Sequence, residues 1–268
     1  MKKRNLVHLT HSANLANSLG QAVVAATSSH ANYPISNIKT PKFSQSWRSN
    51  DVLSNVDITI DLGSAIPINL SGLFNTNLTA AATVTHAAGT TSGVSDYSNA
   101  IAWRSLDEYA LLQGTITYRY HRLRITDAAN PHGFLEAAYL PLGQASEVPV
   151  NHRYEGSPFP GGMDILHVAQ NMMVRSEFGQ PFVDRLYSQT DLTCSFGDMS
   201  TVNRIAMLRW LNSLEEELDP LILIPAADDL YDGYFCRLVT SVRELWRQFH
   251  TLGPVTFRTD GRGKRMAA

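Results

Sequence analysis

The chain has 268 residues, of which 44% are hydrophobic and 17% are charged, and its formal net charge at pH 7 is −2. This composition is typical of a globular protein, and the length exceeds the usual range of one domain, so we expect two domains. A chain so close to neutral lacks the basic stripe that nucleic-acid-binding proteins carry. No apolar run approaches the roughly 20 residues that cross a bilayer, so we expect no transmembrane helix.

The concentrated basic segments lie at the two ends, Met1–Arg4 and Arg262–Arg265, where charge clusters usually form solvated tails. Polar residues from His8 onward interrupt any apolar core after the basic start, so a secretory signal peptide is not expected. The two cysteines, Cys194 and Cys236, are too few for a disulfide scaffold. We expect buried thiols, or one disulfide if their strands are neighbours.

Alternation of apolar and polar residues predicts half-buried strands through the first half of the chain. Val56, Ile58 and Ile60 alternate with polar residues, and the segment Tyr118–Ile125 alternates in the same way. In the second segment, His121, Leu123 and Ile125 are expected on one face and the tyrosines and arginines on the other. Further strands are expected at Ala22–Ala26, Asn69–Phe74, Ala82–His86 and Phe134–Leu140.

Turn-forming residues separate these strands. The segment Ala87–Asn99 is rich in Gly, Thr and Ser, which predicts an exposed loop. Asn130–Gly133 is a strong turn signal, and Asp61-Leu62-Gly63 is expected to close the strand that starts at Val56.

The order of four segments resembles the discoidin-like (coagulation factor 5/8 type C, galactose-binding-like) β-sandwich. These segments are Asn32–Ile38, Trp47–Arg48, the alternating strand that closes on Asp61–Gly63, and Tyr118–Ile125. The resemblance covers much of the first half and implies a jelly-roll sandwich for adhesion or docking. It assigns Trp47 and Arg48 to the fold and implies a ligand site in loops at one end, where exposed aromatic rings stack on sugars.

Trp103, Arg104 and Tyr109 are the candidate ligand-loop residues. They fall in a long insert, Thr79–Leu112, between the segments that carry the resemblance. Core packing is the alternative for these side chains.

The second half has a different composition. Prolines and glycines between Gly143 and Gly162 indicate a linker. We therefore expect a sandwich at 1–145, a linker at 146–160 and a second domain at 161–268. In the second domain, strands are expected at Ile165–Val174 and Asp184–Phe196, then one helix with Ser200 as N-cap, then strands at Leu221–Pro225, Phe235–Val242 and Val255–Thr259. This order predicts an α+β arrangement.

The second half looks like the tail-tube-type domain of siphophage distal and minor tail proteins. The residues that carry this resemblance are Cys194–Phe196, Met207–Trp210, Asp232–Leu238 and Val255–Arg258. In that family a β-sandwich carries one flanking helix, and neighbouring subunits join their sheets into a ring. The resemblance implies a homo-oligomer of three or six copies, partners among the tube, hub and tape-measure proteins, and a virion location after synthesis in the host cytoplasm.

Leu245, Trp246 and Phe249 form an apolar and aromatic stretch near the C-terminus and are the candidate subunit-interface residues. Trp is favoured in such contacts. Core packing or a second amphipathic helix is the alternative.

No motif for catalysis or metal binding is present. The chain has nine histidines but no His-Glu-X-X-His, no Cys-X-X-Cys, no Gly-X-Ser-X-Gly and no glycine-rich phosphate loop. The adjacent acids Asp107–Glu108 and Asp228–Asp229 are expected in solvated turns. We therefore predict no catalytic residue, no metal and no cofactor, and a protein that is not an enzyme.

Taken together, these features predict a mainly β fold: a galactose-binding-like jelly roll followed by a tail-tube-like sandwich with one flanking helix. The expected function is a structural virion protein of a long-tailed phage that builds a ring at the tail tip and carries a peripheral sandwich, which docks neighbours or binds host-surface glycan. The alternative is a stand-alone, lectin-like carbohydrate-binding module with an unrelated second domain.

Overall fold

The computed structural model describes residues 7–10, 13–17, 22–42, 44–50, 54–101, 103–104, 108–147, 163–175, 181–194, 201–217, 220–224, 234–239, 244–245, 251–252 and 255–259. Contacts group the chain into two units. The N-terminal unit comprises residues 5–147 and 221–233, and the C-terminal unit comprises residues 1–4, 148–220 and 234–268. Each unit is described by itself.

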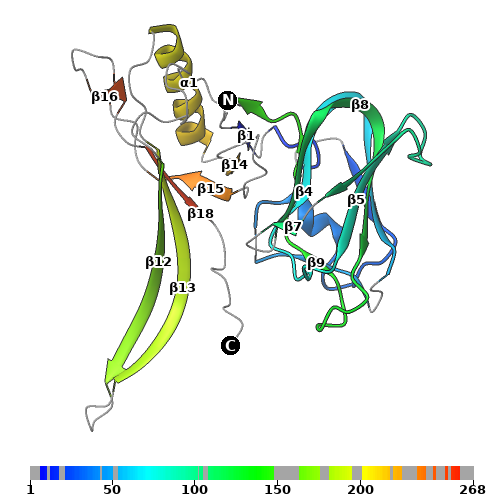
Figure 1. Cartoon of the computed structure of the whole chain (residues 1–268), viewed down its shortest axis with the longest axis horizontal. Coiled ribbons are helices and arrows are strands. Elements are labelled where there is room, and N and C mark those ends of the chain that lie inside the picture. The colour runs from blue at the N-terminus through cyan, green and yellow to red at the C-terminus, as the bar shows by residue number, and fades with distance from the viewer. Residues whose placement is uncertain are drawn as a thin grey trace. The chain divides into compact units, whose positions relative to one another are not determined.

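The N-terminal unit is built on one antiparallel sheet (Figure 1). Its main path runs in the order β10 (Leu142–Gly143), β4 (Val56–Leu73), β8 (Glu108–Thr126), β5 (Thr83–Gly89) and β6 (Tyr97–Ile101). Two short strands join it, β2 (Val23–Ala26) on β4 and β7 (Trp103–Arg104) on β8. The predicted alternation is confirmed, because Val56, Ile58 and Ile60 on β4 are buried.

The core lies between this sheet and a second layer. That layer contains the 3-10 helix η1 (Ile35–Lys39) and the paired strands β3 (Trp47–Arg48) and β9 (Glu136–Ala137). Trp47 and Ile38 are fully buried and pack in one cluster with Ile58 and Leu123 from the sheet. The Trp47 indole N–H donates to the carbonyl of Ser28 at 3.2 Å, so its polar atom is satisfied inside the core.

The expected turn at Asp61-Leu62-Gly63 is wrong, because β4 continues through it. The register against β8 shifts between Asp61 and Ile66, which pair with Tyr120 and Tyr118, so extra residues bulge from β4 at this point. Gly63 adopts φ +77°, which glycine reaches without steric cost. The strands predicted at Val56 and at Asn69 are therefore one strand.

Two other expectations need correction. The loop expected over Ala87–Asn99 is shorter, since Ala87 and Ala88 are buried in β5 and pair with the start of β6. The strand expected over Phe134–Leu140 shrinks to β9, because the backbone that follows β9 bonds to two other segments: the Tyr139 N–H donates to the Phe74 carbonyl and the Leu140 N–H to the Ile38 carbonyl. The turn predicted at Asn130–Gly133 is confirmed, with Gly133 at φ +72°.

Three short strands of the N-terminal unit pair outside its main sheet. β1 (Val7–Thr10) pairs antiparallel with β11 (Ser146–Glu147) on one edge and with β14 (Leu221–Ile224) on the other. The strand expected at Leu221–Pro225 is thus confirmed, and its side chains from Leu221 to Leu223 are buried. Its pairing with β1 was not predicted from the sequence. The domain boundaries expected at residues 145 and 161 remain a prediction.

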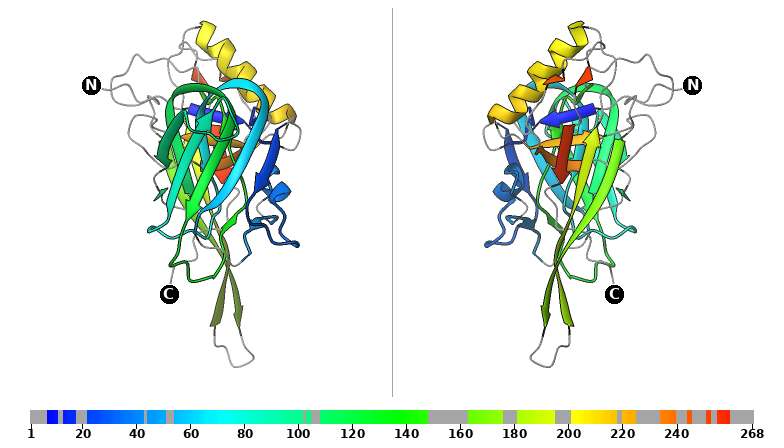
Figure 2. Two further views of the ribbon diagram at one scale, coloured as in Figure 1. Left: turned by 90° about the vertical axis from the view of Figure 1, so that its right-hand side faces the viewer. Right: turned by 90° about the vertical axis from the view of Figure 1, so that its left-hand side faces the viewer.

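The C-terminal unit contains an antiparallel ladder in the order β15 (Tyr234–Leu238), β18 (Val255–Thr259), β13 (Pro181–Cys194) and β12 (Met163–Arg175). β12 and β13 lie side by side in every view (Figures 1 and 2). α1 (Thr201–Glu217) contacts β15, and β16 (Glu244–Leu245) pairs with β17 (Thr251–Leu252). The predicted order of strands, helix and strands is confirmed.

The cysteines lie on strands that are not neighbours. Cys194 ends β13 and Cys236 lies in β15, and β18 runs between these two strands. Adjacent strands are about 4.8 Å apart, so a further strand between them separates the two residues beyond disulfide reach. Cys236 is a buried thiol.

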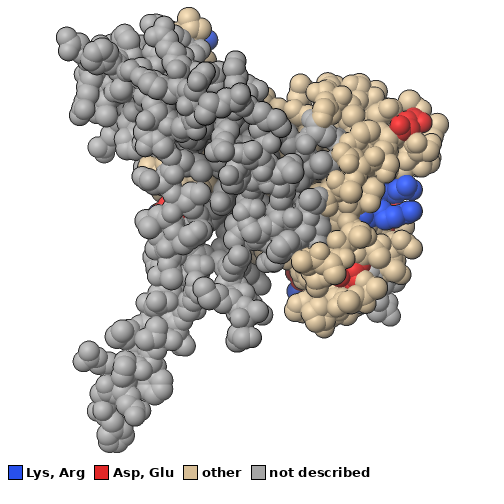
Figure 3. All heavy atoms as spheres, in the orientation of Figure 1, with Lys and Arg blue, Asp and Glu red and all other residues tan. Residues whose placement is uncertain are grey.

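The predicted mainly β class is confirmed by these antiparallel sheets. The described part of the chain contains no helix with the length and apolarity that a bilayer crossing requires. In Figure 3, most described atoms on the visible face belong to uncharged residues, and the charged side chains form a few small groups.

Candidate ligand-binding site

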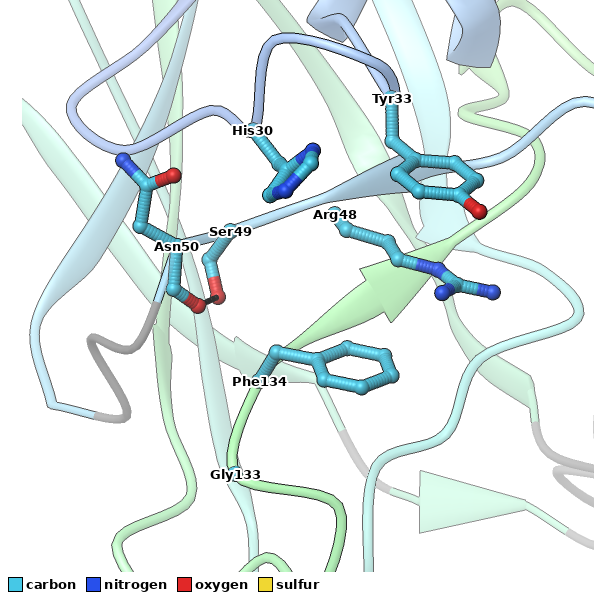
Figure 4. A pocket seen from close by; sticks show the side chains of 7 residues that line it. All are labelled: His30, Tyr33, Arg48, Ser49, Asn50, Gly133 and Phe134. Atoms are coloured by element: carbon cyan, nitrogen blue, oxygen red, sulfur yellow. Dashed lines mark hydrogen bonds between the residues drawn. The ribbon is translucent and has the colours of Figure 1, made fainter.

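A cavity of about 550 Å³ opens on the N-terminal unit where three loop segments meet. The segments are the turn after β2, the end of β3 with the residues that follow, and the turn that precedes β9. The cavity is lined by His30, Tyr33, Arg48, Ser49, Asn50, Gly133 and Phe134 (Figure 4). Residues distant in sequence therefore form one concave surface.

Backbone hydrogen bonds fix the first wall. The His30 N–H donates to the carbonyl of Arg48 at 2.8 Å, and the Arg48 N–H donates to the carbonyl of Tyr33 at 3.1 Å. The Asn32 N–H donates to His30 Nδ1 at 3.2 Å. These bonds hold both ends of the His30–Tyr33 turn against β3, so the two rings are placed by the backbone.

A buried polar network fixes the second wall. The Asn130 side-chain amide donates to Asp127 at 3.0 Å and to the carbonyl of Asn77 at 3.1 Å, which anchors the turn. Ser49 and Leu135 exchange two bonds: the Ser49 N–H donates to the Leu135 carbonyl at 2.8 Å, and the Leu135 N–H donates to Ser49 Oγ at 2.9 Å. Phe134 is therefore held next to β3.

The Arg48 side chain lies between two aromatic rings. Its guanidinium carbon is 4.0 Å from the centre of the Tyr33 ring and 4.8 Å from that of Phe134. Glu136, its cross-strand partner on β9, approaches Arg48 Nε to 3.3 Å and Nη2 to 3.4 Å. Figure 4 shows the guanidinium between the rings. Stacking and pairing together preorganise this arginine.

Several polar groups of the lining are available to a ligand. Within the described part of the chain, the Tyr33 hydroxyl, His30 Nε2 and the Asn50 side-chain amide have no hydrogen-bond partner. His30 and Asn50 are exposed, and Tyr33 and Phe134 are partly exposed. The cavity thus combines ring surface with unsatisfied donors and acceptors.

The residues predicted for the ligand loop lie in two paired strands. Trp103 in β7 pairs with Tyr109 in β8, and Arg104 pairs with Glu108. The backbone thus brings Trp103 and Tyr109 together, and their role in ligand binding remains a prediction.

Of the residues predicted for a subunit interface, Leu245 lies in β16 and pairs with Thr251. The helix considered for this stretch is therefore not formed at Leu245. Trp246 and Phe249 lie outside the described residues, and the interface remains a prediction.

Sequence reasoning did not select the cavity residues. It placed Arg48 in the fold, which is correct for its β3 pairing, but Arg48 also lines the cavity. His30, Asn50 and Phe134 were not singled out. Their position in the sequence could have identified them, because they lie beside the Asn32–Ile38 segment and the Asn130–Gly133 turn. The family resemblance places the ligand site in loops at one end of the sandwich.

A second polar cluster lies on three neighbouring strands of the sheet, β4, β8 and β5. Ser71 Oγ lies 3.1 Å from His86 Nδ1, His86 Nε2 lies 3.1 Å from His121 Nδ1, and His121 Nε2 lies 3.1 Å from the Tyr118 carbonyl. Because a carbonyl only accepts, His121 Nε2 carries the proton, and Nδ1 of the neutral His121 ring then accepts from His86 Nε2. Burial lowers the pKa of His121 from 6.5 to about 4. Ser71 and both imidazoles are buried, so these hydrogen bonds satisfy polar groups inside the core.

No group of three or more His, Cys, Asp or Glu residues is placed to hold a metal ion among the residues that the structure describes.

Comparisons with known proteins identify similar solved structures, but they do not identify a family. No family model matches the chain, and no curated protein matches it. The chain is similar to the module CpGH89CBM32-5 of Clostridium perfringens in complex with GalNAc-β-1,3-galactose, with 18% identity over 46% of this chain and 94% of that one and a TM-score of 0.38. It is similar to a variant of chitosan-binding module 1 from a chitosanase/glucanase of Paenibacillus sp. IK-5, with 17% identity over 48% and 97% and a TM-score of 0.40. It is also similar to the family 32 carbohydrate-binding module of C. perfringens NanJ in complex with galactose, with 13% identity over 51% and 98% and a TM-score of 0.38.

Proposed function

We propose that the N-terminal unit is a carbohydrate-binding module and that the cavity lined by His30, Tyr33, Arg48, Asn50 and Phe134 binds a glycan. The observation that carries the proposal is the composition of the cavity: two aromatic side chains beside an arginine, an imidazole and an amide. The proposed role is binding without catalysis.

A sugar has the chemistry that this lining complements. A pyranose ring offers patches of C–H groups on its faces and pairs of hydroxyls at its rim. The partly exposed rings of Tyr33 and Phe134 offer apolar surface to the C–H patches. His30, Asn50 and Arg48 offer donors and acceptors to the hydroxyls. Ligand pockets usually combine apolar surface with a few fixed polar groups and measure roughly 300–1,000 Å³, a range that includes this cavity.

The preorganised walls support binding. The turn at His30–Tyr33 and the residues around Phe134 are held by hydrogen bonds that exist without a ligand. A ligand therefore does not have to order these loops, and less of its interaction energy is lost on binding.

The test is a glycan array probed with the full chain and with three variants. Phe134→Ala and Asn50→Ala each remove one kind of contact, and we expect each to weaken binding by about tenfold, equivalent to about 1.4 kcal/mol. Tyr120→Ala is the matched control, because Tyr120 also stacks on an arginine, Arg119, but does not line the cavity. Binding that survives both cavity variants, or no binding to any glycan, contradicts the proposal.

A second candidate function, which we propose for the C-terminal unit, is assembly of a ring in a phage tail. The observation in its favour is β12, a strand of 13 residues at the end of the described ladder that pairs there with β13 alone. A long strand edge of this kind can pair with a neighbouring copy. The protein would then function in the virion, next to the tube, hub or tape-measure proteins, and the sandwich would bind host-surface glycan.

Light scattering of the full chain across a concentration series tests this candidate. A closed assembly of three or six copies is expected, and Trp246→Ala should disperse it and leave the subunit folded. A monomer at every concentration contradicts self-assembly.

A further inference from the structure

The charge of Arg48 is balanced at the back of the cavity. Of the described residues that line the cavity, Arg48 is the only Lys, Arg, Asp or Glu. Glu136 lies outside the lining and faces Arg48 across the β3–β9 pair, with both carboxylate oxygens within 3.4 Å of guanidinium nitrogens. The cavity therefore contains a cationic group whose field is largely cancelled by a carboxylate behind it.

Glu136 is itself held in this position. The Ser46 hydroxyl also donates to its Oε1, and its backbone N–H donates to Asn77 Oδ1 at 2.7 Å. The side chains of Arg48 and Glu136 are 31% and 23% exposed, so the pair is only partly screened by water. Reorienting Arg48 toward an anionic ligand would break both the ion pair and its stacking on Tyr33 and Phe134.

We propose that the cavity selects neutral sugars over acidic ones and that Glu136 sets this preference. The inference rests on the proposed glycan function. A neutral sugar can accept a hydrogen bond from Arg48 and leave the Arg48–Glu136 pair intact. A sugar carboxylate gains little from a guanidinium that is already paired, and it meets the negative charge of Glu136. Glu136 is therefore a specificity residue that need not touch the ligand.

The test is calorimetric titration of the full chain with two pairs of sugars that differ only at C6: galactose with galacturonic acid, and glucose with glucuronic acid. The wild-type protein is expected to bind a neutral sugar at least about tenfold more tightly than its acid, which corresponds to about 1.4 kcal/mol. Glu136→Gln keeps the size of the side chain and an oxygen for Ser46. This variant should tighten binding of the acid about tenfold, with a new dependence on salt, and leave the neutral sugar within about twofold.

Asp61→Asn is the matched control. It also removes one carboxylate from an ion pair with an arginine, here Arg119 at 2.7 and 2.9 Å, but it lies outside the cavity. It should leave the ratio of acid to neutral affinity unchanged, and thermal melts of both variants report folding. Equal affinity for a sugar and its acid in the wild type, or an unchanged ratio in Glu136→Gln, overturns the selectivity alone. No binding of any of the four sugars, with none on the glycan array, overturns the proposed function together with it.

Discussion

At the residue scale, the buried imidazole of His121 links the stability of this fold to pH. His86 and His121 lie in one series of hydrogen bonds, in which a neutral His121 donates from Nε2 to the Tyr118 carbonyl and accepts at Nδ1 from His86 Nε2. Burial is the main cause of the lowered pKa of His121, and the hydrogen bond to the Tyr118 carbonyl opposes it in part.

The native state therefore resists a proton that the unfolded chain accepts. As the pH falls from 6.5 toward about 4, the unfolded state gains a proton at His121 and the native state does not, so stability is lost across this window. The loss is up to about 3 kcal/mol, at about 1.4 kcal/mol for each pKa unit. Urea unfolding at pH 4 to 8 measures it. A free energy of unfolding that stays constant between pH 6.5 and 4.5 would contradict a neutral His121 in the native state. Asp61 does not cause this change, because Arg119 and the Gly63 N–H lower its pKa from 3.8 to about 2, so its contribution to stability is lost only below the window.

At the element scale, the bulge in β4 lets one strand of 18 residues follow the curvature of the sheet. The Asp61 carboxylate holds the bulge in place with hydrogen bonds to β4 itself and to β8. One carboxylate oxygen accepts the Gly63 N–H at 2.8 Å, and both oxygens accept from Arg119 on the neighbouring strand. Gly63 supplies the positive φ that the bulge requires.

Gly63→Ala is expected to lower the free energy of unfolding by roughly 1–2 kcal/mol, the usual cost of a left-handed conformation for a residue with a Cβ. The cost is purely conformational, since an added Cβ at Gly63 would meet nothing within 4 Å. Gly114→Ala is the matched control, because its Cβ is equally unhindered and its φ is not positive. Chemical denaturation measures the free energy of unfolding of both variants. Equal values for Gly63→Ala and Gly114→Ala would show that the bulge does not depend on glycine.

The same strand shows how far sequence alone can predict this fold. Alternation around Val56 and Tyr118 correctly predicted which faces are buried, because period-2 patterns are local. The turn at Asp61–Gly63 was wrong, because Asp and Gly favour turns and bulges alike, and the difference depends on pairing with β8. The cavity was missed for a related reason: His30, Arg48 and Phe134 come from three segments, and only the tertiary fold brings them together.

At the scale of the whole molecule, the N-terminal unit is built from segments that are far apart in the sequence. β1 pairs with β14, so residues 7–10 form a ladder with residues 221–224. Leu9 and Leu223 are buried in this region. A fragment that ends at residue 147 would leave β1 without this partner and expose apolar surface. Ligand binding therefore has to be measured on the full chain.

The most direct test of the account is titration of the full chain and of Phe134→Ala with the glycan that binds best on the array. The account predicts a saturable heat of binding for the wild type and a dissociation constant about tenfold higher for Phe134→Ala, with Tyr120→Ala equal to the wild type. Equal affinity of all three proteins would place the ligand elsewhere, and the absence of a glycan that binds would contradict the carbohydrate-binding function.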